Sequence, residues 1–302
     1  MKIIPITPRG YCKGVVQAIN LAKKTRKDYP TAKISMLGMI VHNQHVIDAC
    51  RNIGIECVEH KGKSRLDLLD DIHEGIVIFT AHGVSDQVIE KAISKGLVVV
   101  DASCSDVTKT KEIVKDHLLH NAEVLYIGKS GHPEAEAITS LSSKVHLITS
   151  TADIDNLPQL PNVVLTNQTT MSILEVANLI DHAKKKYPHL IVEEEICSAT
   201  RVRQEALQQL NHVDCLLVVG DPKSNNTLKL REIAIHHHIP KIYLIETAND
   251  LQEKWLCGVE TIAVTSGAST PTLLTEQVLI ALEAYNEQGF LSKIEIDYSK
   301  LL

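Results

Sequence analysis

Short apolar runs that alternate with helical segments constrain the fold of this chain more than any other feature of its sequence. Each run is nearly continuous and rich in β-branched residues, as expected of parallel strands that are buried on both faces. There are nine such runs, at 2–6, 34–40, 76–79, 98–100, 124–127, 163–165, 216–219, 242–245 and 261–264. Because helical segments lie between the runs, the sequence predicts an α/β fold with parallel sheets.

Three of the seven cysteines recur at nearly equal intervals along the chain. Cys104 follows Cys12 by 104 − 12 = 92 residues, and Cys197 follows Cys104 by 197 − 104 = 93 residues. A helical segment lies beside each of them, at 15–24, 107–119 and 201–210. One thiol in each third of the chain, always at the start of a helix, predicts three similar modules that meet at one sulfur-ligated centre.

The cysteine spacing also gives the predicted module boundaries, because no linker rich in Pro, Gly or Ser marks them. We predict α/β modules at 13–103, 104–196 and 197–285. The strand and loop at 1–12 are expected to join the third module, because Cys12 opens the first module as the later cysteines open theirs. Residues 286–302 are expected to form a C-terminal tail over the surface.

Composition favours a soluble, cytoplasmic protein of the size of an enzyme. The formal net charge of −6 and the lack of a Lys/Arg-rich run argue against nucleic-acid binding. No stretch approaches the ~20 apolar residues of a membrane span, and the Pro-broken start does not resemble a signal peptide. An odd number of scattered cysteines suits reduced thiols or a metal site better than a disulfide framework.

Polar side chains gather where the predicted strands end. In open parallel sheets, ligands bind beyond the carboxyl ends of the strands. The residues at these ends are His42, His82, Cys104, His132, Glu134, Thr169, Thr170, Ser224, Asn226 and Ser269. Loops after strands are polar in most proteins, but nine ends enriched in His, Cys, Ser, Thr and Asn favour a shared site.

The three spaced cysteines have two explanations on spacing alone. Thiolates are soft ligands that bind zinc, copper(I) or iron–sulfur clusters, and the local cysteine pair of a structural zinc site is missing here. A 4Fe–4S cluster usually takes four cysteines, so three would leave one iron open to bind a substrate oxygen. Three buried structural cysteines are the equal alternative, since unpaired cysteine is among the most buried residues.

The histidines divide into two groups. His82 and His132 lie in turns bounded by glycine, which favours exposure to a cleft, and Glu134 beside His132 forms a candidate proton-donating pair. His42 by itself is more simply a residue at a helix start. The run 236–238 is more simply a solvated helix end than a metal site.

Two predicted helix starts could bind an anion. Residues 224–227 precede a helical segment at 228–235, and residues 267–271 precede another at 273–284. Both are expected to be N-caps, with Pro271 in a first helical turn. The alternative to capping alone is a diphosphate held by both helix starts. A nucleotide cofactor is not supported, because the chain has neither a Walker loop nor Gly-x-Gly-x-x-Gly.

Ten motifs in this order resemble those of the 4-hydroxy-3-methylbut-2-enyl diphosphate reductases, the IspH/LytB family, over about residues 1–285. Four surround the cysteines or the proposed acid: Pro8-Arg9-Gly10-Tyr11-Cys12-Lys13-Gly14-Val15, Asp101-Ala102-Ser103-Cys104, Gly131-His132-Pro133-Glu134 and Ile196-Cys197-Ser198-Ala199-Thr200. The others are Val41-His42-Asn43, Ala81-His82-Gly83-Val84, Gln168-Thr169-Thr170, Arg203-Gln204-Glu205-Ala206, Ser224-Asn225-Asn226 and Gly267-Ala268-Ser269-Thr270-Pro271.

The resemblance implies a pseudo-threefold trefoil of α/β modules around one 4Fe–4S cluster. It implies that Cys12, Cys104 and Cys197 are the cluster ligands and that the fourth iron is open to the substrate hydroxyl. Glu134 would supply protons, and His132 and Thr169 would order the hydrogen-bond network. The residues implied in diphosphate binding are His42, His82, His132, Thr169, Ser224, Asn225, Asn226 and Ser269.

The reaction that the resemblance implies is a reductive dehydroxylation, the last step of the methylerythritol phosphate route to isoprenoids. Two single electrons from ferredoxin or flavodoxin and two protons would remove the hydroxyl as water. The products would be isopentenyl and dimethylallyl diphosphate. We expect a monomer or weak dimer that binds a small diphosphate and neither nucleic acid nor membrane.

Several positions depart from the usual family pattern near the cysteine and phosphate loops. They are Lys13, Ser105, Ala137, Arg201, Val202 and the run 221–225. None replaces a proposed ligand or the proposed acid, yet they leave open a paralogous 4Fe–4S dehydroxylase acting on another small phosphorylated polyol. A non-enzymatic sensor that carries a cluster is a weaker alternative, because Glu134 and Thr169 would then share no purpose.

Overall fold

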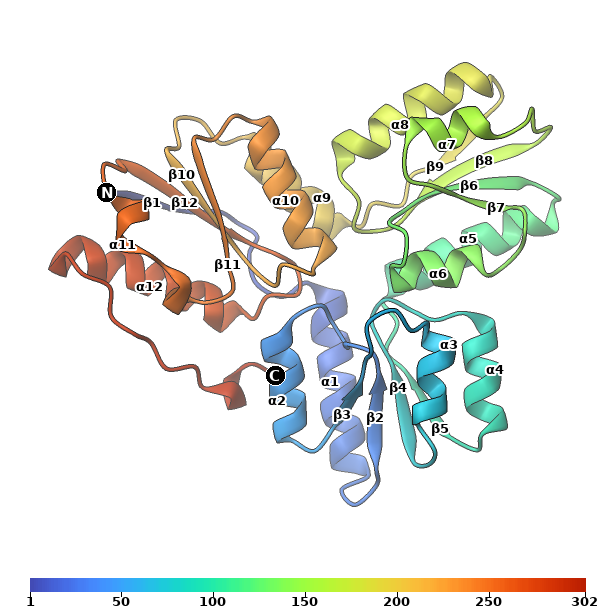
Figure 1. Ribbon diagram of the computed structural model, residues 1–302, viewed down its shortest axis with the longest axis horizontal. Helices are drawn as coiled ribbons and strands as arrows, with labels where there is room; N and C mark the ends of the chain where they lie inside the picture. Colours follow the sequence, from blue (N-terminus) through green and yellow to red (C-terminus); the bar gives the residue numbers. More distant parts are fainter. The chain divides into compact units, whose positions relative to one another are not determined.

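The computed structural model describes residues 1–302 and contains three four-stranded parallel sheets (Figure 1). The chain divides into two compact units. The first comprises Met1–Val16, Val41–Asn52 and Ser198–Leu302, and the second comprises Gln17–Ile40 and Ile53–Cys197. Helix α1 (Lys13–Asp28) runs from the first unit into the second. The predicted α/β class with parallel sheets is confirmed.

The second unit holds two sheets, with the strand orders β3-β2-β4-β5 and β7-β6-β8-β9. The strands of the first sheet are β2 (Ile34–Leu37), β3 (Glu56–Val58), β4 (Ile76–Phe79) and β5 (Val98–Asp101). Those of the second are β6 (Glu123–Ile127), β7 (Val145–Ile148), β8 (Val163–Asn167) and β9 (Ile191–Glu193). The helices are α3 (Arg65–Leu68), η1 (Leu69–Asp71), α4 (Asp86–Ser94), α5 (Ser105–Leu119), α6 (Pro133–Thr139), α7 (Thr151–Asn156) and α8 (Ile173–Lys186).

The first unit holds the third sheet, with the strand order β11-β10-β12-β1. Its strands are β1 (Lys2–Pro5), β10 (Cys215–Val219), β11 (Lys241–Ile245) and β12 (Thr261–Ser266). The helices are α2 (Gln44–Asn52), α9 (Ser198–Gln208), α10 (Asn225–His236), η2 (Ala248–Asp250), α11 (Glu253–Leu256), α12 (Thr272–Gln288) and η3 (Tyr298–Lys300). Strand β1 pairs with β12, so the start of the chain completes this sheet.

All three sheets follow one topology. In the two sheets of the second unit, the first and third strands in chain order lie in the middle, and the second strand lies at one edge. In the third sheet β10 and β12 take the middle places and β11 the edge place. The other edge is taken by β5, β9 or β1. Strand β1 therefore has the place in its sheet that β5 and β9 have in theirs, although it comes from the opposite end of the chain. The module boundaries that the cysteine spacing predicts stay a prediction.

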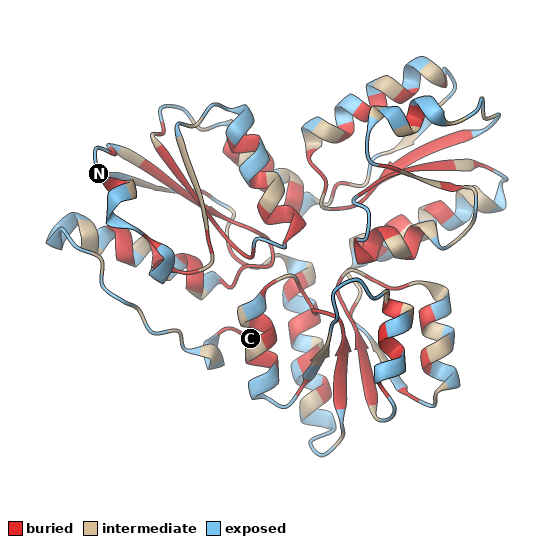
Figure 2. Cartoon of the chain, viewed as in Figure 1, coloured by how far each residue is buried: buried red, intermediate tan, exposed pale blue.

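Helices cover both faces of the sheets, and this explains why the central strands read as continuous apolar runs. Helices α7 and α8 cover one face of the β6–β9 sheet, and α5 and α6 cover the other (Figure 1). Every residue of β8 and β10 is buried, and Figure 2 shows the middle strands as the most buried part of each sheet. The predicted burial of these strands on both faces is confirmed.

Three strands were not predicted from the sequence, namely β3, β7 and β9. Each lies at a sheet edge and is only three or four residues long, with a charged residue or a histidine among them. Short, polar edge strands are common in natural sheets because they discourage pairing with other chains. No helix has both the length and the apolar character that crossing a membrane requires.

The residues after α12 were predicted to form a surface tail, but the end of this segment is packed within the first unit. Helix α12 continues to Gln288, and the chain then returns to α2. Leu301 is only 1% exposed and packs with Ala49 of α2 and Leu274 of α12. The end of this segment therefore belongs to a small apolar cluster of the first unit.

Candidate functional site

Cys12, Cys104 and Cys197 have the same local position in their sheets. Each follows an edge strand (β1, β5 or β9) and directly precedes a helix (α1, α5 or α9). Each backbone N–H donates a 3.0 Å hydrogen bond to a carbonyl in the loop after the neighbouring strand: Cys12 to Ala268, Cys104 to Ala81 and Cys197 to Thr169. The three thiols are thus held by one repeated arrangement of strand, loop and helix.

This arrangement suits thiols that bind a metal. All three cysteines are partly exposed, and none of the seven cysteines is in a disulfide. The start of a helix favours negative charge, and the thiolate is the form that binds metal. The remaining four cysteines do not share the position: Cys50 and Cys215 are buried inside α2 and β10, Cys57 is a partly exposed residue of β3, and Cys257 is exposed after α11.

Glu134 is a buried carboxylate at the first turn of α6. His132 caps this helix, because its ring Nδ1 accepts the Glu134 N–H at 3.2 Å, and Pro133 takes the first helical position. The Glu134 side chain is 1% exposed and accepts two bonds from Thr169 of the β8–α8 loop. The Thr169 N–H donates to Oε1 at 2.8 Å, and the Thr169 hydroxyl donates to Oε2 at 2.9 Å.

Burial decides the protonation of Glu134. Loss of solvent raises the pKa of Glu134 from 4.5 to about 7, against the opposing effect of the hydrogen bonds from Thr169 and Tyr126. The Tyr126 hydroxyl donates to Oε1 at 3.3 Å, and burial raises the pKa of this tyrosine, so that it keeps its proton. Glu134 can therefore hold or release a proton near neutral pH.

Two histidines of the second unit lie beside each other near this acid. The rings of His82 and His132 meet edge to face, with 5.4 Å between their centroids. His82 follows β4, and its Nδ1 lies 3.4 Å from the Thr80 hydroxyl. Strands β4 and β6 belong to different sheets of the unit, so the fold brings together two loops that the sequence separates by 50 residues (132 − 82).

Ser224 and Ser269 join two loops of the first unit. The Ser269 hydroxyl donates to the His42 carbonyl at 2.9 Å and lies 3.4 Å from the Ser224 hydroxyl. Ser224 is the N-cap of α10, where its Oγ accepts the Thr227 N–H. Both serines are under 9% exposed. The structure thus brings together Ser224, Ser269 and the backbone of His42, in agreement with the sequence placing all three at strand ends.

The two asparagines at the start of α10 are nearly buried. Asn226 accepts the Ala268 N–H at 3.0 Å and donates to the Thr200 hydroxyl at 3.1 Å. Ala268 is the residue whose carbonyl holds Cys12, so Asn226 supports the same loop. Asn225 is 4% exposed at the first position of α10. The helix start predicted at 224–227 is confirmed.

The second helix start differs from its prediction. Helix α12 begins at Thr272, with Pro271 at the N-cap position, and no side chain caps it. Pro271 therefore precedes the first turn instead of lying inside it. Ser269 is not a cap, since its hydroxyl bonds to His42 and Ser224. Its side chain is thus part of the polar cluster and does not cap the start of α12.

Close packing at Thr227 fixes the first turn of α10 against the sheet. A Cβ added to Gly267 would lie 2.2 Å from the Thr227 hydroxyl oxygen, and one added to Gly220 would lie 2.6 Å from it. Gly220 follows β10 and Gly267 follows β12. The absence of a side chain at both positions lets α10 approach the ends of these strands.

Sequence reasoning missed three residues that support the site. Tyr126 lies inside an apolar strand and reads as core, and only its hydroxyl contact with Glu134 gives it a role. Asp221 accepts the N–H groups of Lys223 and Gln44, at 2.7 and 3.1 Å. Arg203, 2% exposed, donates to the Gly10 carbonyl at 2.7 Å. The available signal for Arg203 was its place in the motif Arg203-Gln204-Glu205-Ala206.

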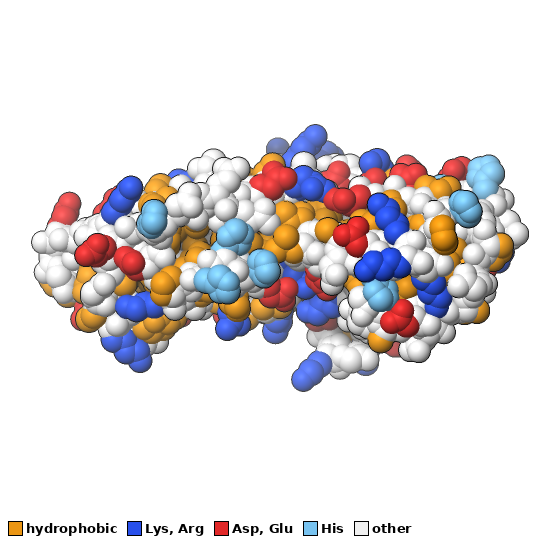
Figure 3. All heavy atoms as spheres, turned by 90° about the horizontal axis from the view of Figure 1, so that it is seen from above, with side chains coloured by type: hydrophobic (Ala, Val, Ile, Leu, Met, Phe, Trp, Pro, Cys, Tyr) orange, Lys and Arg blue, Asp and Glu red, His pale blue; other side chains and the backbone are white.

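The exposed histidines do not form part of this site. His236 ends α10, His237 is its C-cap, and His238 has a φ of 56°; all three are exposed. The predicted solvated helix end is confirmed. On the face drawn in Figure 3, several histidine side chains gather in one group and others lie singly, and acidic and basic side chains are mixed over the rest.

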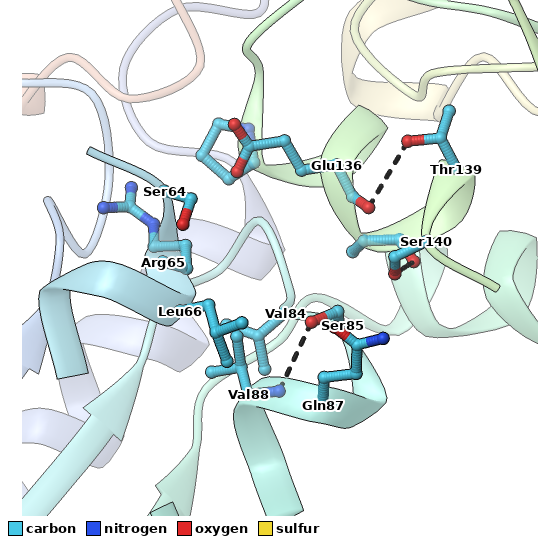
Figure 4. A pocket seen from close by; sticks show the side chains of 12 residues that line it. Ser64, Arg65, Leu66, Val84, Ser85, Gln87, Val88, Glu136, Thr139 and Ser140 are labelled. Carbon is cyan, nitrogen blue, oxygen red and sulfur yellow. Dashed lines mark hydrogen bonds between the residues drawn. The ribbon is translucent and has the colours of Figure 1, made fainter. Parts of the chain in front are cut away.

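A separate pocket of about 370 Å³ lies on the outer side of α6, lined also by residues of α3 and α4 (Figure 4). Glu136 lines it two residues after the buried acid Glu134, and burial raises the pKa of Glu136 while the Arg65 guanidinium lowers it. Arg65 pairs with Glu59 at 2.7 Å and packs over Gly38. Glu134 does not line this pocket, so α6 presents Glu134 and Glu136 to different surroundings.

The fold and the site together define the class of protein. It is an α/β protein with three sheets of one topology, each of which presents a cysteine at the start of the helix that follows its edge strand. A buried carboxyl group and two histidines lie at strand ends of the second unit, and a hydroxyl and amide cluster lies at those of the first.

Comparison with known proteins agrees with this description. The sequence matches the family described as LytB protein over residues 3–283. A 4-hydroxy-3-methylbut-2-enyl diphosphate reductase of Bacillus pumilus is 45% identical over 309 aligned residues, which cover 100% of this chain and 98% of the relative. The chain belongs to the LytB family. Members of this family use an iron–sulfur cluster.

Two solved structures resemble the fold. The E-1-hydroxy-2-methyl-but-2-enyl-4-diphosphate reductase of Plasmodium falciparum superimposes with a TM-score of 0.86 at 31% identity, covering 94% of this chain and 88% of that one. A second reductase, described as the terminal enzyme of the non-mevalonate pathway, has a TM-score of 0.65 at 28% identity, with 94% and 99% coverage. The α/β fold with three parallel sheets, which the family resemblance implies, is therefore confirmed.

Proposed function

We propose that this chain is a 4-hydroxy-3-methylbut-2-enyl diphosphate reductase of the non-mevalonate pathway. Membership of the LytB family and relatives of that name support the proposal. The reaction replaces the hydroxyl group of the substrate by hydrogen, consuming two electrons and two protons and releasing one water. The products are isopentenyl and dimethylallyl diphosphate, and the electrons come from a donor such as ferredoxin or flavodoxin.

Cys12, Cys104 and Cys197 are the proposed ligands of one 4Fe–4S cluster with one open iron. The residues fit such a group: three thiols, a soft ligand set, occupy one repeated and partly exposed position at helix starts. When bound, the cluster supplies electrons one at a time and a Lewis-acidic iron. The spacing alone leaves structural cysteines as an explanation, but buried structural cysteines would not need partial exposure at three equivalent helix starts.

Glu134 is the proposed proton donor. Its burial, with the raised pKa that follows, is the observation that best supports the proposed function. A buried carboxyl group with a pKa of about 7 is protonated in a useful fraction at neutral pH, which an exposed glutamate is not. Thr169 fixes both of its oxygens. His132, which caps the same helix, is proposed to order the hydrogen bonds around the substrate together with Thr169.

Eight residues that the sequence places after its strands are the proposed diphosphate ligands. Hydroxyl, amide and backbone N–H donors at the start of α10 suit an anion, because a helix start carries unpaired donors and partial positive charge. The histidines add donors that become cationic on protonation. The proposed set is His42, His82, His132, Thr169, Ser224, Asn225, Asn226 and Ser269.

The alternative is a paralogous dehydroxylase for another small phosphorylated polyol. Lys13, Ser105 and Ala137, which depart from the usual family pattern, favour this alternative. None of these side chains replaces Glu134, Thr169 or a proposed cysteine ligand, and the relative at 45% identity is named for the hydroxymethylbutenyl substrate. We therefore favour the authentic reductase, acting in the cytoplasm on a small diphosphate.

A cysteine substitution series tests the proposal. Cys12→Ser, Cys104→Ser and Cys197→Ser should each abolish anaerobic assembly of a complete cluster, measured as iron and sulfide per chain and visible absorbance. Cys257→Ser is the matched control, because Cys257 is exposed and lies outside the repeated position. A complete cluster in any of the first three variants would overturn that ligand assignment, and loss in the control would show that the assay reports folding.

A further inference from the structure

The loop that carries Cys12 is held by four hydrogen bonds from three directions. Gly10 N–H donates to the Ser266 hydroxyl at 2.7 Å, and Cys12 N–H donates to the Ala268 carbonyl at 3.0 Å. Arg203 of α9 donates to the Gly10 carbonyl at 2.7 Å. The fourth bond is from the Tyr11 hydroxyl to the Leu301 carbonyl, at 2.6 Å.

The last of these bonds ties the loop to the segment 296–302. Leu301 is anchored by its own side chain, which is 1% exposed between α2 and α12. A second contact is made by Tyr298, whose hydroxyl lies 3.2 Å from the Nδ1 of His45 on α2. The acceptor of the Tyr11 hydrogen bond is therefore a carbonyl on a packed segment.

The other cysteine loops differ at the equivalent residue. Ser103 precedes Cys104, and its hydroxyl donates to Asp101 at the end of β5 at 2.5 Å. Ile196 precedes Cys197 and is buried in the core of the β6–β9 sheet. Tyr11 instead reaches a carbonyl 290 positions further along the chain. The Cys12 loop therefore has one hydrogen bond to a distant part of the chain that is not found at the residue preceding Cys104 or Cys197.

We propose that the segment 296–302 is a strap that positions the Cys12 loop for cluster binding, with Tyr11 as the positioning residue. The inference deepens the proposed function, since it takes Cys12 as a cluster ligand. Loops open locally when few contacts hold them, and a cluster is lost when a ligand moves away. The strap slows opening of the Cys12 loop and so keeps the thiol in place before and after the cluster is bound.

Hydrogen exchange on the cluster-free protein tests the strap without any turnover. Tyr11→Phe keeps the ring and removes the hydroxyl, and it should speed exchange at the Gly10 and Cys12 amides about fivefold, the ratio that one net hydrogen bond is worth. The amides of Cys104 and Cys197 should not change. Tyr243→Phe is the matched control, because Tyr243 lies on β11 of the same unit with its ring stacked on Trp255.

A second variant removes most of the buried Leu301 side chain that anchors the segment, and keeps both partners of the Tyr11–Leu301 hydrogen bond. Leu301→Ala empties part of the cluster with Ala49 and Leu274, and it should also accelerate exchange at Gly10 and Cys12. In the reconstituted protein, both variants should lose iron to a chelator at least threefold faster than wild type. Turnover per intact cluster should stay within twofold, because neither side chain is proposed to touch substrate.

Unchanged exchange at Gly10 and Cys12 in Tyr11→Phe would overturn the strap. Equal acceleration at all three cysteine loops would overturn it as well, because that pattern reports general loss of stability. If wild type assembles no cluster, the proposed function fails, yet the exchange experiment still decides whether segment 296–302 holds the loop. The two ideas can therefore fail separately.

Discussion

Thr169 holds both carboxylate oxygens of Glu134, one through its backbone N–H at 2.8 Å and the other through its hydroxyl at 2.9 Å. The same residue accepts the Cys197 N–H at its carbonyl. One residue of the β8–α8 loop therefore links the proposed proton donor to the backbone of a proposed cluster ligand. The geometry of the acid and the position of the cysteine cannot change independently.

Glu134→Gln should abolish most turnover and leave the fold and the cluster intact. The amide has the size of the acid, and the Thr169 hydroxyl can turn to accept a hydrogen bond from it. Loss of a positioned acid typically lowers the rate 10²- to 10⁴-fold. Anaerobic turnover and visible absorbance measured on one sample check this, and wild-type turnover in the variant would remove Glu134 from the mechanism.

Activity should fall as pH rises through about 7. The pKa of Glu134 lies near 7 because of burial, and the protonated form is the one that donates. The rate should therefore be level below pH 6 and drop about tenfold per pH unit well above pH 7. A rate profile that stays flat to pH 9 at saturating substrate would contradict the assignment.

The unfolding free energy of the protein should also fall as pH rises. Between pH 4.5 and about 7, Glu134 is ionised in the unfolded chain and protonated in the folded one, so unfolding releases a proton. Wild type should accordingly lose about 3 kcal/mol of unfolding free energy relative to Glu134→Gln as pH rises through this window. Denaturant unfolding of both proteins at several pH values measures the difference, and a difference that does not vary with pH would refute it.

Thr169→Val should lower the maximal rate about tenfold and move the alkaline limb of the profile to higher pH. The hydroxyl bond lowers the pKa of Glu134, and removing it leaves burial less opposed. Thr169→Ser should restore both properties. Thr166→Val is the matched control on β8: its buried hydroxyl has no partner, so the change should leave the rate and the stability near wild type. An unshifted profile in Thr169→Val would argue against the hydroxyl bond.

Gly10→Ala should destabilise the protein far more than Gly62→Ala. Both glycines have positive φ, 77° and 84°, where alanine costs about 1 kcal/mol. A Cβ at Gly10 would also lie 2.4 Å from the Thr272 hydroxyl oxygen, whereas one at Gly62 meets nothing within 4 Å. We expect about 3 kcal/mol or more for Gly10→Ala. Equal unfolding free energies of the two variants would show that the Gly10 loop can move aside.

Much of the fold could be predicted because the central strands are buried on both faces. Strands such as β8 and β10 are buried throughout, so their residues form apolar runs that are recognisable in the sequence. The edge strands β3, β7 and β9 were harder to predict from the sequence. In β7, His146 pairs with Glu123 of β6 at 2.7 Å, so part of that strand is stabilised by a polar pair that an apolar pattern does not reveal.

Prediction of the site had a similar limit. Glu134 and Thr169 stand in loops where polar residues are noticeable, and the carboxyl ends of parallel strands gave a reason to group them. Tyr126 lies within an apolar strand, and that pattern gives no sign of its hydroxyl contact with Glu134. The Tyr11 to Leu301 bond joins the two ends of the chain, and no local pattern predicts a contact over 290 residues.

The most direct test of the central claim is anaerobic turnover of the reconstituted protein with reduced methyl viologen and hydroxymethylbutenyl diphosphate. We predict oxidation of two viologen equivalents per substrate, with isopentenyl and dimethylallyl diphosphate as the products. A spectroscopically intact 4Fe–4S cluster with no viologen oxidation and no such products would contradict the account, and would direct attention to another small phosphorylated substrate.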